Sequence, residues 1–352
     1  MIAVERDAGV DEMKGKLMNK RERVDAALRG AAVDRVPISF WGHNYLQEWS
    51  PSGLADAMLE NYHTYDWDYM KVNPRASYHV EDWGGELVRS NDPNRGPTFK
   101  RPAVTEPSDW RRLRPLAPDR GALGEQLDAL RQIGANLQGD AYFAQTIFSP
   151  LAIAKYLVGN RPEPIKVALD DDPGALRAAL NVIVETFATY AQACLEAGAS
   201  GIFFATTGWA SADILTIDQY RRWGIEYDLP LLEAVAGRAP FNILHNCGEH
   251  VYFDLLADYP VQAISWASTL PGNPTLAEGK TRTQKAVMGG VSEKTTLVDG
   301  SPDEVAGEVR AAIAQTSGLR VLVAPGCSIS PRTPSANLAA AARAARGDQA
   351  NQ

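Results

Sequence analysis

The 352-residue sequence has few cysteines, no long apolar run and no basic excess, and each shortage excludes a class of protein. Three cysteines scattered along the chain do not make the disulfide framework of a small secreted domain, so thiol or metal chemistry is the better interpretation. Nowhere do about 18 uncharged apolar residues run together, and the N-terminus lacks the apolar stretch of a signal peptide. We therefore expect a soluble, cytoplasmic protein.

The charge balance excludes a dedicated binder of nucleic acid or anionic membranes. The chain has 35 Lys and Arg against 43 Asp and Glu, a net charge of −8, so no basic excess is available to displace phosphate counterions. A hydrophobic share of 45% with 22% charged residues is that of a packed globule, which excludes disordered, collagen-like and coiled-coil chains.

Short apolar runs alternate with longer segments of helical spacing, which predicts parallel strands joined by helices. Runs such as Gly201-Ile202-Phe203-Phe204-Ala205 lack polar alternation, as in strands that are covered on both faces. The fold class we predict is α/β, a (β/α)8 TIM barrel over residues 19–346. Its eight strands should begin near Val36, Trp67, Ala141, Gly201, Phe241, Gln262, Ala286 and Arg320.

Some segments depart from this rhythm. The proline-rich stretch of about 73–139 is expected to be a long insertion after the second strand that partly covers the barrel mouth.

Asn19 is expected to cap the first helix, which Gly30 ends. Residues 1–18 form a leader that we expect to be poorly ordered, and residues 347–352 form a tail. The sequence leaves open whether Met1 or Met18 is the native start. Later helices are expected over 172–199, 217–237, 250–259 and 302–317.

The most informative residues are a histidine and two cysteines. In the expected fifth strand, period-2 geometry puts His245 and Cys247 on one face at the C-terminal end, pointing into the barrel mouth. Cys327 follows the eighth strand at the equivalent position. Two thiolates and one imidazole suit zinc, and three protein ligands leave an open position, as in a catalytic site. The alternatives are two buried cysteines that never meet, or a disulfide between them.

Five further residues are candidates for a catalytic or binding role. His43 follows the first strand and is expected to line the mouth, although a hydrogen-bonded loop histidine is the alternative. Lys71 and Arg75 follow the second strand and are candidates to clamp a carboxylate or sulfonate, with a solvated charge pair as the alternative. Asp213 is, with Glu249, a candidate fourth zinc ligand or a residue that orients one, and helix capping is the alternative for both.

Common cofactor motifs are missing, and residues for binding an organic cofactor remain unknown. Pro274 stands where a phosphate-binding loop ending in Gly279-Lys280-Thr281 would need its first glycine. No Gly-x-Gly-x-x-Gly follows a strand, and no Asp-x-His-x-x-Gly corrinoid-binding motif is present. A corrinoid, if used, must therefore arrive on another protein.

The chain resembles the uroporphyrinogen decarboxylase superfamily over about residues 18–345. The resemblance rests on these motifs in order: Arg35-Val36-Pro37, Leu215-Thr216-Ile217-Asp218-Gln219-Tyr220, His245-x-Cys247-Gly248, Gly289-Gly290-Val291, Ala324-Pro325-Gly326-Cys327 and Pro331-x-Thr333-Pro334-x-x-Asn337-Leu338. It implies a (β/α)8 barrel. The chain resembles the zinc-dependent corrinoid methyltransferases of that superfamily, of the methylcobamide:coenzyme M type, more than it resembles the decarboxylases. The resemblance implies that their zinc ligands map onto His245, Cys247 and Cys327. The decarboxylases carry an Arg-Gln-Ala-Gly-Arg stretch after the first strand, where this chain has Ile38-Ser39-Phe40-Trp41-Gly42-His43, so a role in haem synthesis is not expected.

The resemblance implies a zinc-dependent methyltransferase. A zinc-bound thiolate of a small acceptor would attack the methyl group of a methylated corrinoid protein docked at the barrel mouth. The alternatives are a decarboxylase or other lyase acting on a small carboxylate, and a non-catalytic barrel that binds a corrinoid or its carrier. The sequence identifies neither the acceptor, the donor, the fourth zinc ligand nor the oligomeric state.

Overall fold

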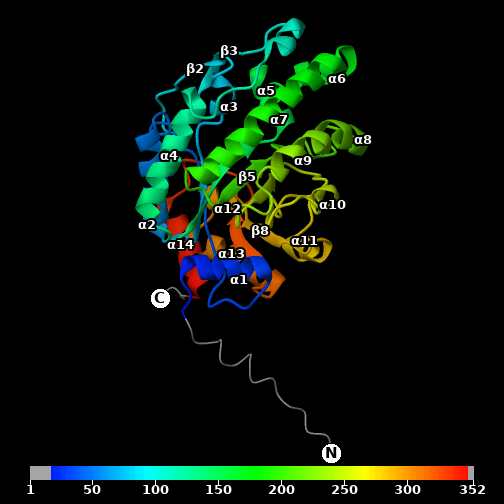
Figure 1. The fold of residues 1–352 in the computed structure, drawn as a ribbon. Helices are drawn as coiled ribbons and strands as arrows, with labels where there is room; N and C mark the ends of the chain where they lie inside the picture. The colour runs from blue at the N-terminus through cyan, green and yellow to red at the C-terminus, as the bar shows by residue number, and fades with distance from the viewer. Residues whose placement is uncertain (1–16, 348–352) are drawn as a thin grey trace, which may run out of the picture.

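The computed structural model describes residues 17–347, which lie in one curled, all-parallel sheet wrapped by helices (Figure 1). Seven strands form the sheet in the order β1-β4-β5-β6-β7-β8-β9, and each starts within two residues of an expected position. Their bounds are β1 Tyr69–Val72, β4 Tyr142–Phe148, β5 Gly201–Ala205, β6 Ile243–Asn246, β7 Ala263–Trp266, β8 Ala286–Val291 and β9 Val321–Pro325. The structure confirms the predicted α/β barrel class.

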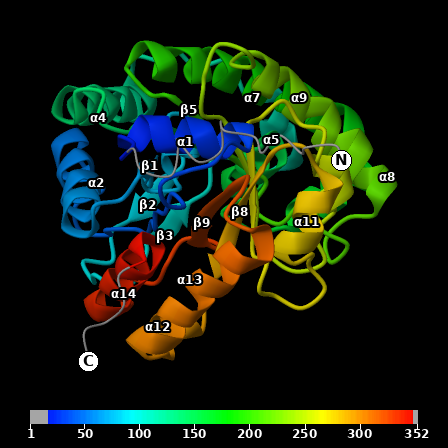
Figure 2. The same ribbon diagram turned by 90° about the horizontal axis from the view of Figure 1, so that it is seen from below.

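Helices cover the outside of the sheet, as the view from below shows (Figure 2). The longer ones are α1 Lys20–Arg29, α2 Pro51–Tyr65, α4 Gly121–Leu137, α5 Pro150–Leu157, α6 Glu163–Asp171, α7 Pro173–Glu196, α9 Glu226–Glu233, α13 Pro302–Thr316 and α14 Ser335–Arg346. The shorter ones are α3 Tyr78–Glu81, η1 Pro107–Arg112, α8 Ile217–Tyr220, η2 Arg221–Ile225, α10 Phe253–Leu256, α11 Leu276–Arg282 and α12 Thr296–Asp299. Helix α7 is long and apolar enough to cross a membrane, and one of its faces is buried in the core.

The strand expected at Val36 is not a regular strand, although it occupies the eighth position of the barrel. Ser39 N–H donates to Val323 of β9 at 3.2 Å, and Asp68 N–H donates to the Ile38 carbonyl at 3.0 Å, so the segment joins β9 to the start of β1. A ladder cannot continue here because Pro37 has no N–H and the N–H of Ile38 donates to the Asp68 carboxylate at 2.9 Å. The segment therefore closes the barrel through isolated bridges.

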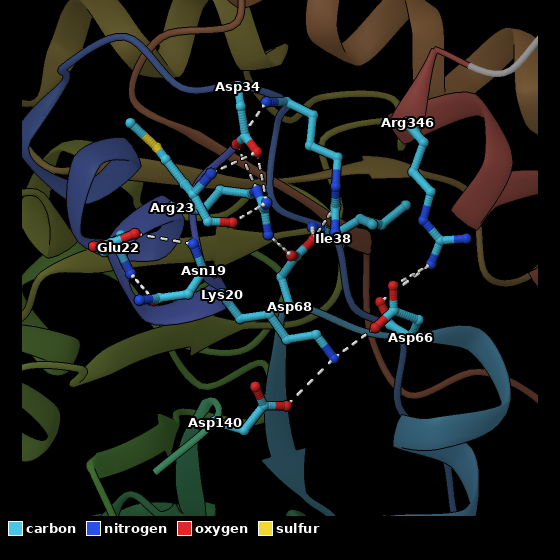
Figure 3. Close-up of polar contacts among 12 residues, drawn as sticks. Asn19, Lys20, Glu22, Arg23, Asp34, Ile38, Asp66, Asp68, Asp140 and Arg346 are labelled. Atoms are coloured by element: carbon cyan, nitrogen blue, oxygen red, sulfur yellow. Dashed lines mark hydrogen bonds and ion pairs between the residues drawn. The ribbon is translucent and has the colours of Figure 1, made fainter. Parts of the chain in front are cut away.

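A buried charge cluster fixes this closure (Figure 3). The Asp68 carboxylate, which is fully buried, accepts hydrogen bonds from Arg23 at 2.7 Å and from Arg35 at 2.6 Å. Arg23 also pairs with Asp34 at 2.7 Å. Because Arg23 belongs to α1, the cluster holds that helix across the closed end of the barrel (Figure 2). Asn19 caps α1 in a capping box and Gly30 ends it in a left-handed conformation, as the sequence predicts.

The segment expected to be an insertion, 73–139, has two parts. An antiparallel hairpin of β2 Glu86–Val88 and β3 Thr98–Arg101 lies between α3 and η1. Helix α4, in contrast, is the ordinary crossover helix between β1 and β4, with a buried face that includes Leu123, Leu130 and Ile133. The irregular part is therefore narrower than expected and ends where α4 begins.

Two of the later helices also differ from expectation. Residues 217–233 form one continuous helical segment, α8, η2 and α9, with a π-helical turn at its middle. The helix expected from His250 begins only at Phe253, because Gly248 (φ 97°) and His250 (φ 50°) take left-handed conformations that a helix cannot include.

Candidate functional site

Three potential metal ligands meet at the C-terminal ends of the strands. His245 lies in β6, Cys247 follows that strand, and Cys327 follows β9. Strand alternation turns His245 and Cys247 to the same side, toward the inside of the barrel. One ligand atom from each of the three residues lies within 4.8 Å of the other two. The structure therefore brings together the three residues that the sequence predicts as ligands.

The geometry is suitable for a zinc ion. Zn–S bonds near 2.3 Å and Zn–N bonds near 2.0 Å place tetrahedral ligand atoms about 3.5–4 Å apart, within the observed limit. Both cysteines are free thiols, so they form no disulfide, and they are not two buried residues that never meet. Two thiolates with one neutral imidazole form a zinc ligand set that leaves a fourth position for a substrate.

Hydrogen bonds within this cluster shift the pKa values of its two thiols in opposite directions. Hydrogen bonds from the Cys247 thiol and from His245 lower the pKa of Cys327 well below its usual value, while the pairing with Cys327 and burial raise the pKa of Cys247. The pair therefore holds one thiolate readily. Displacing the remaining proton is the step in which a metal ion would assist.

Ser265 fixes the orientation of the His245 ring. Ser265 lies directly opposite His245 in the parallel register of β6 and β7, and its Oγ hydrogen-bonds Nδ1 of the imidazole at 3.1 Å. Both residues are buried. Because Nδ1 is occupied, Nε2 is the ring nitrogen left for Cys327 or for a metal ion.

The cluster forms part of the wall of a cavity of about 320 Å³ at the barrel mouth. Aromatic rings of Trp41, Phe148 and Phe203 supply much of the remaining wall, together with two lysines, Lys71 and Lys155. Among residues 17–347, no Asp or Glu lines this cavity. It therefore combines a soft metal-binding end with a cationic side, which favours a small anionic ligand.

Lys71 lies inside β1, one residue before its end, and not after the strand as the sequence predicts. Its Nζ hydrogen-bonds Asn73 and lies 5.0 Å from the centre of the Phe203 ring, and the residue is 5% exposed. Within residues 17–347 it forms no ion pair with a carboxylate. Burial lowers the pKa of Lys71 to about 7, and the nearby Cys327 and Glu48 act in the opposite direction.

Arg75 does not line the cavity and is already paired, so the expectation that it clamps a substrate anion is wrong. Its guanidinium is buried and pairs with Glu81 at 2.8 Å and with Glu125 at 2.7 Å. These bidentate and charge-assisted contacts use the donors that a substrate carboxylate would need. Arg75 instead ties the segment after β1 to α3 and α4.

Asp213 also lies apart from the metal ligands. Its carboxylate pairs with His250 Nδ1 at 2.9 Å, and both side chains are about half exposed. Asp213 is absent from the group of side chains that could share a metal ion, and Glu249 is exposed. The structure therefore gives neither residue a position as fourth ligand.

His43 lines the cavity, and a carboxylate holds it. Its Nδ1 lies 2.8 Å from Oε2 of Glu48, and its ring stacks on Tyr45 with ring centres 5.1 Å apart. Glu48 is 1% exposed. The sequence gives no signal for this pair, because a glutamate in a polar loop is ordinarily solvated.

The sequence did not point to several other residues of the site. Lys155 and Tyr156 come from α5, after β4, and Thr207 comes from the loop after β5. Thr207 has a left-handed backbone (φ 48°), which is unusual for a β-branched residue and is found at functional sites. Ser265 could have been found, since it is the polar residue in an otherwise apolar strand.

Comparisons with known proteins agree with this geometry. The profile of the uroporphyrinogen decarboxylase (URO-D) family matches residues 19–347. The methylcobamide:CoM methyltransferase MtaA of Methanosarcina barkeri is 25% identical over 341 residues, covering 91% of this chain and 95% of that protein. The uroporphyrinogen decarboxylase of Edwardsiella ictaluri is 31% identical, but over 38% of this chain and 37% of its own length. The solved structure of a methyltransferase from Methanosarcina mazei has a TM-score of 0.80 and 25% identity, covering 94% of this chain and 99% of that chain.

Proposed function

The chain belongs to the uroporphyrinogen decarboxylase family, and from this premise we propose that it is a zinc-dependent methyltransferase. It would move a methyl group from a methylated corrinoid, carried by a separate protein, to a small thiol. The observation that supports this best is the convergence of His245, Cys247 and Cys327 within 4.8 Å at the barrel mouth. The similarity to a methylcobamide:CoM methyltransferase over 91% of the chain adds to it.

The three ligands determine the charge of the site. Two thiolates and a neutral imidazole balance the two positive charges of Zn²⁺, so the site carries no net positive charge. Bound there, zinc would allow an acceptor thiol to lose its proton at neutral pH. A site without net positive charge leaves electron density on the acceptor sulfur, which a nucleophile requires.

The cavity residues would bind and orient the acceptor. Lys71 and Lys155 offer ammonium donors to an anionic group at the far end of a short thiol. Phe148 and Phe203 exclude water beside the reacting sulfur. The corrinoid would approach from the open mouth, so that the methyl carbon, the sulfur and the leaving cobalt lie in line.

Lys71 also supports the second candidate, a lyase acting on a small carboxylate. A buried ammonium with no carboxylate partner in the described chain is the feature that such a substrate would need. A porphyrinogen with several propionates is disfavoured, because Arg75 is already paired and the segment 38–43 contains no arginine.

Two measurements test the proposal. Zinc X-ray absorption on protein loaded with one equivalent of zinc should show two sulfur ligands, and three after 3-mercaptopropionate or 2-mercaptoethanesulfonate is added. Free methylcobalamin should then be demethylated, as its visible absorption spectrum records. Uroporphyrinogen should not be turned over.

The outcomes separate the candidates. Protein that acts fully without metal, or that decarboxylates a substrate while methylcobalamin stays intact with every thiol, contradicts methyl transfer and favours the lyase. Tight binding of methylcobalamin with no reaction of any kind favours a non-catalytic corrinoid-binding barrel.

A further inference from the structure

We propose that His43, held by Glu48, is the base that removes the proton of the acceptor thiol as its sulfur binds beside Cys247 and Cys327. The inference rests on the proposed function and assigns a role that the metal ligands cannot fill. His43 lines the same cavity as both cysteines, which is the space that the acceptor would enter.

The contact with Glu48 determines which nitrogen of His43 is available. A carboxylate accepts hydrogen bonds and donates none, so the proton of the neutral ring lies on Nδ1, 2.8 Å from Glu48 Oε2. Nε2 then carries the lone pair, and within residues 17–347 no group hydrogen-bonds it. Stacking on Tyr45 further restrains the ring. A histidine oriented by a carboxylate in this way is the arrangement that activates nucleophiles in many enzymes.

Glu48 is a buried carboxylate whose hydrogen bonding centres on His43. Its side chain is 1% exposed, and Oε1 has no hydrogen-bond partner in the described chain. Because a buried carboxylate is costly to leave unpaired, the contact of Oε2 with Nδ1 restrains both side chains.

The proton transfer balances without a further reactant. The S–H bond of the acceptor breaks, its electron pair stays on sulfur, and the proton bonds to Nε2 of His43. The sulfur would then use its electron pair to bond the methyl carbon, while the carbon–cobalt bond breaks and its two electrons stay on the corrinoid cobalt, which goes from Co(III) to Co(I). The imidazole side chain is 21% exposed, so it can return the proton to water.

Charged and titratable groups surround His43. Lys71 and Lys155 line the same cavity, and Glu48 contacts the ring. The charge of Lys71 decreases as the pH rises through neutrality, because burial lowers the pKa of that lysine to about 7. The titratable groups that line cavities with His43 are Tyr45, Glu48, Glu60, Tyr65, Lys71, His79, Lys155, Tyr156, His245, Cys247 and Cys327.

Calorimetry gives a test that does not depend on turnover. Titration of zinc-loaded protein with 3-mercaptopropionate at pH 7, in two buffers of different ionisation enthalpy, counts the protons released per thiol. The wild type should release clearly less than one proton, because His43 retains part of it, and His43→Gln should release about one. His63→Gln, the same change at an exposed position of α2, should match the wild type.

Equal proton counts for the wild type and His43→Gln would overturn the inference. A change in the count caused by Lys71→Met but not by His43→Gln would overturn it as well and assign the proton to the lysine. If zinc X-ray absorption shows no added sulfur in any variant, the proposed function itself has failed, which is a separate result.

Kinetics with free methylcobalamin supply the second readout. His43→Gln should lower kcat about 100-fold at pH 7, with the KM for the thiol within a few-fold and with partial rescue by added imidazole. Glu48→Gln should give a smaller loss, because Glu48 positions the ring and does not touch the substrate. A His43→Gln variant that keeps its melting temperature and its full kcat would contradict a role for His43 as base.

Discussion

The three cysteines of this chain differ in the environment that each thiol meets. Cys247 and Cys327 are half-buried at strand ends and lie together with His245, whereas Cys194 is fully buried in α7. Burial raises the pKa of Cys194, which keeps it a neutral core residue. Thiolate character, which the proposed metal binding requires, therefore belongs to the pair at the barrel mouth.

Substitution of the paired cysteines should remove the metal. Cys247→Ala and Cys327→Ala should each lower zinc content from about one per chain to near zero after dialysis, because each removes a charged ligand from a site that has three. Cys194→Ala is the control and should keep its zinc while losing about 1 kcal/mol of stability. Metal analysis of the purified proteins measures this. Retention of zinc by either ligand variant would contradict the proposed coordination.

Ser265 should matter for metal affinity although it is not a ligand. Ser265→Ala removes the hydrogen bond to His245 Nδ1 and should weaken zinc binding about 10- to 100-fold, as for other groups that orient metal-bound histidines. Ser211→Ala is a matched control, since Ser211 is also buried but its hydroxyl donates to the Glu249 carbonyl. Competition with a chromophoric chelator measures both. Equal zinc affinities would show that β6 alone orients the ring.

At the scale of elements, the segment α8, η2 and α9 carries a buried carboxyl group that should make stability depend on pH. Asp228 in α9 is fully buried, and Oδ2 accepts hydrogen bonds from the hydroxyls of Tyr220 and Tyr259, both at 2.8 Å. Burial nevertheless raises the pKa of Asp228 to about 7. The folded protein therefore binds a proton between pH 4 and 7 that the unfolded chain releases.

Stability should accordingly fall as pH rises through this range. Between pH 4 and 7, the ionisation of buried Asp228 should lower the unfolding free energy by about 4 kcal/mol, from about 1.4 kcal/mol per pKa unit over about three units. Asp228→Asn has no carboxyl group to titrate at this position, so its unfolding free energy should vary less between pH 4 and 7 than that of the wild type. Urea unfolding at a series of pH values measures the slope. Identical slopes in the two proteins would mean that Asp228 stays ionised in the fold.

At the scale of the whole molecule, the barrel is closed by charges as well as by strands. The segment from Val36 has few ladder hydrogen bonds, and Asp68 joins α1, this segment and β1 through Arg23, Arg35 and the backbone of Ile38 (Figure 3). Removal of the central carboxylate would leave two guanidinium groups without that partner in a buried place.

Asp68→Asn should lower the unfolding free energy by about 3–5 kcal/mol. Asp128→Asn breaks an exposed pair with Arg131 and should cost about 1 kcal/mol or less, which makes it a suitable control. Denaturant unfolding followed by circular dichroism compares them. A similar small loss in both variants would show that backbone contacts alone close the barrel.

The sequence was sufficient for the barrel class, the seven regular strands and the convergence of His245, Cys247 and Cys327. Strand positions follow from local apolar runs, and His245 and Cys247 share a face because side chains alternate along a strand. Cys327 could be added because parallel strands all end at the same rim. Local periodicity and one rule of topology therefore determined the core of the site.

Only the tertiary structure decided which charged residues are available to a substrate. Arg75 and Lys71 look alike in sequence, yet Arg75 is neutralised by Glu81 and by Glu125 of α4. Within residues 17–347, Lys71 hydrogen-bonds Asn73 and forms no ion pair with a carboxylate. His43 likewise gains its orientation from Glu48, whose burial no local pattern reveals. The physical reason is that the state of a charged side chain depends on partners and solvent exclusion supplied by distant elements, and the local pattern records neither.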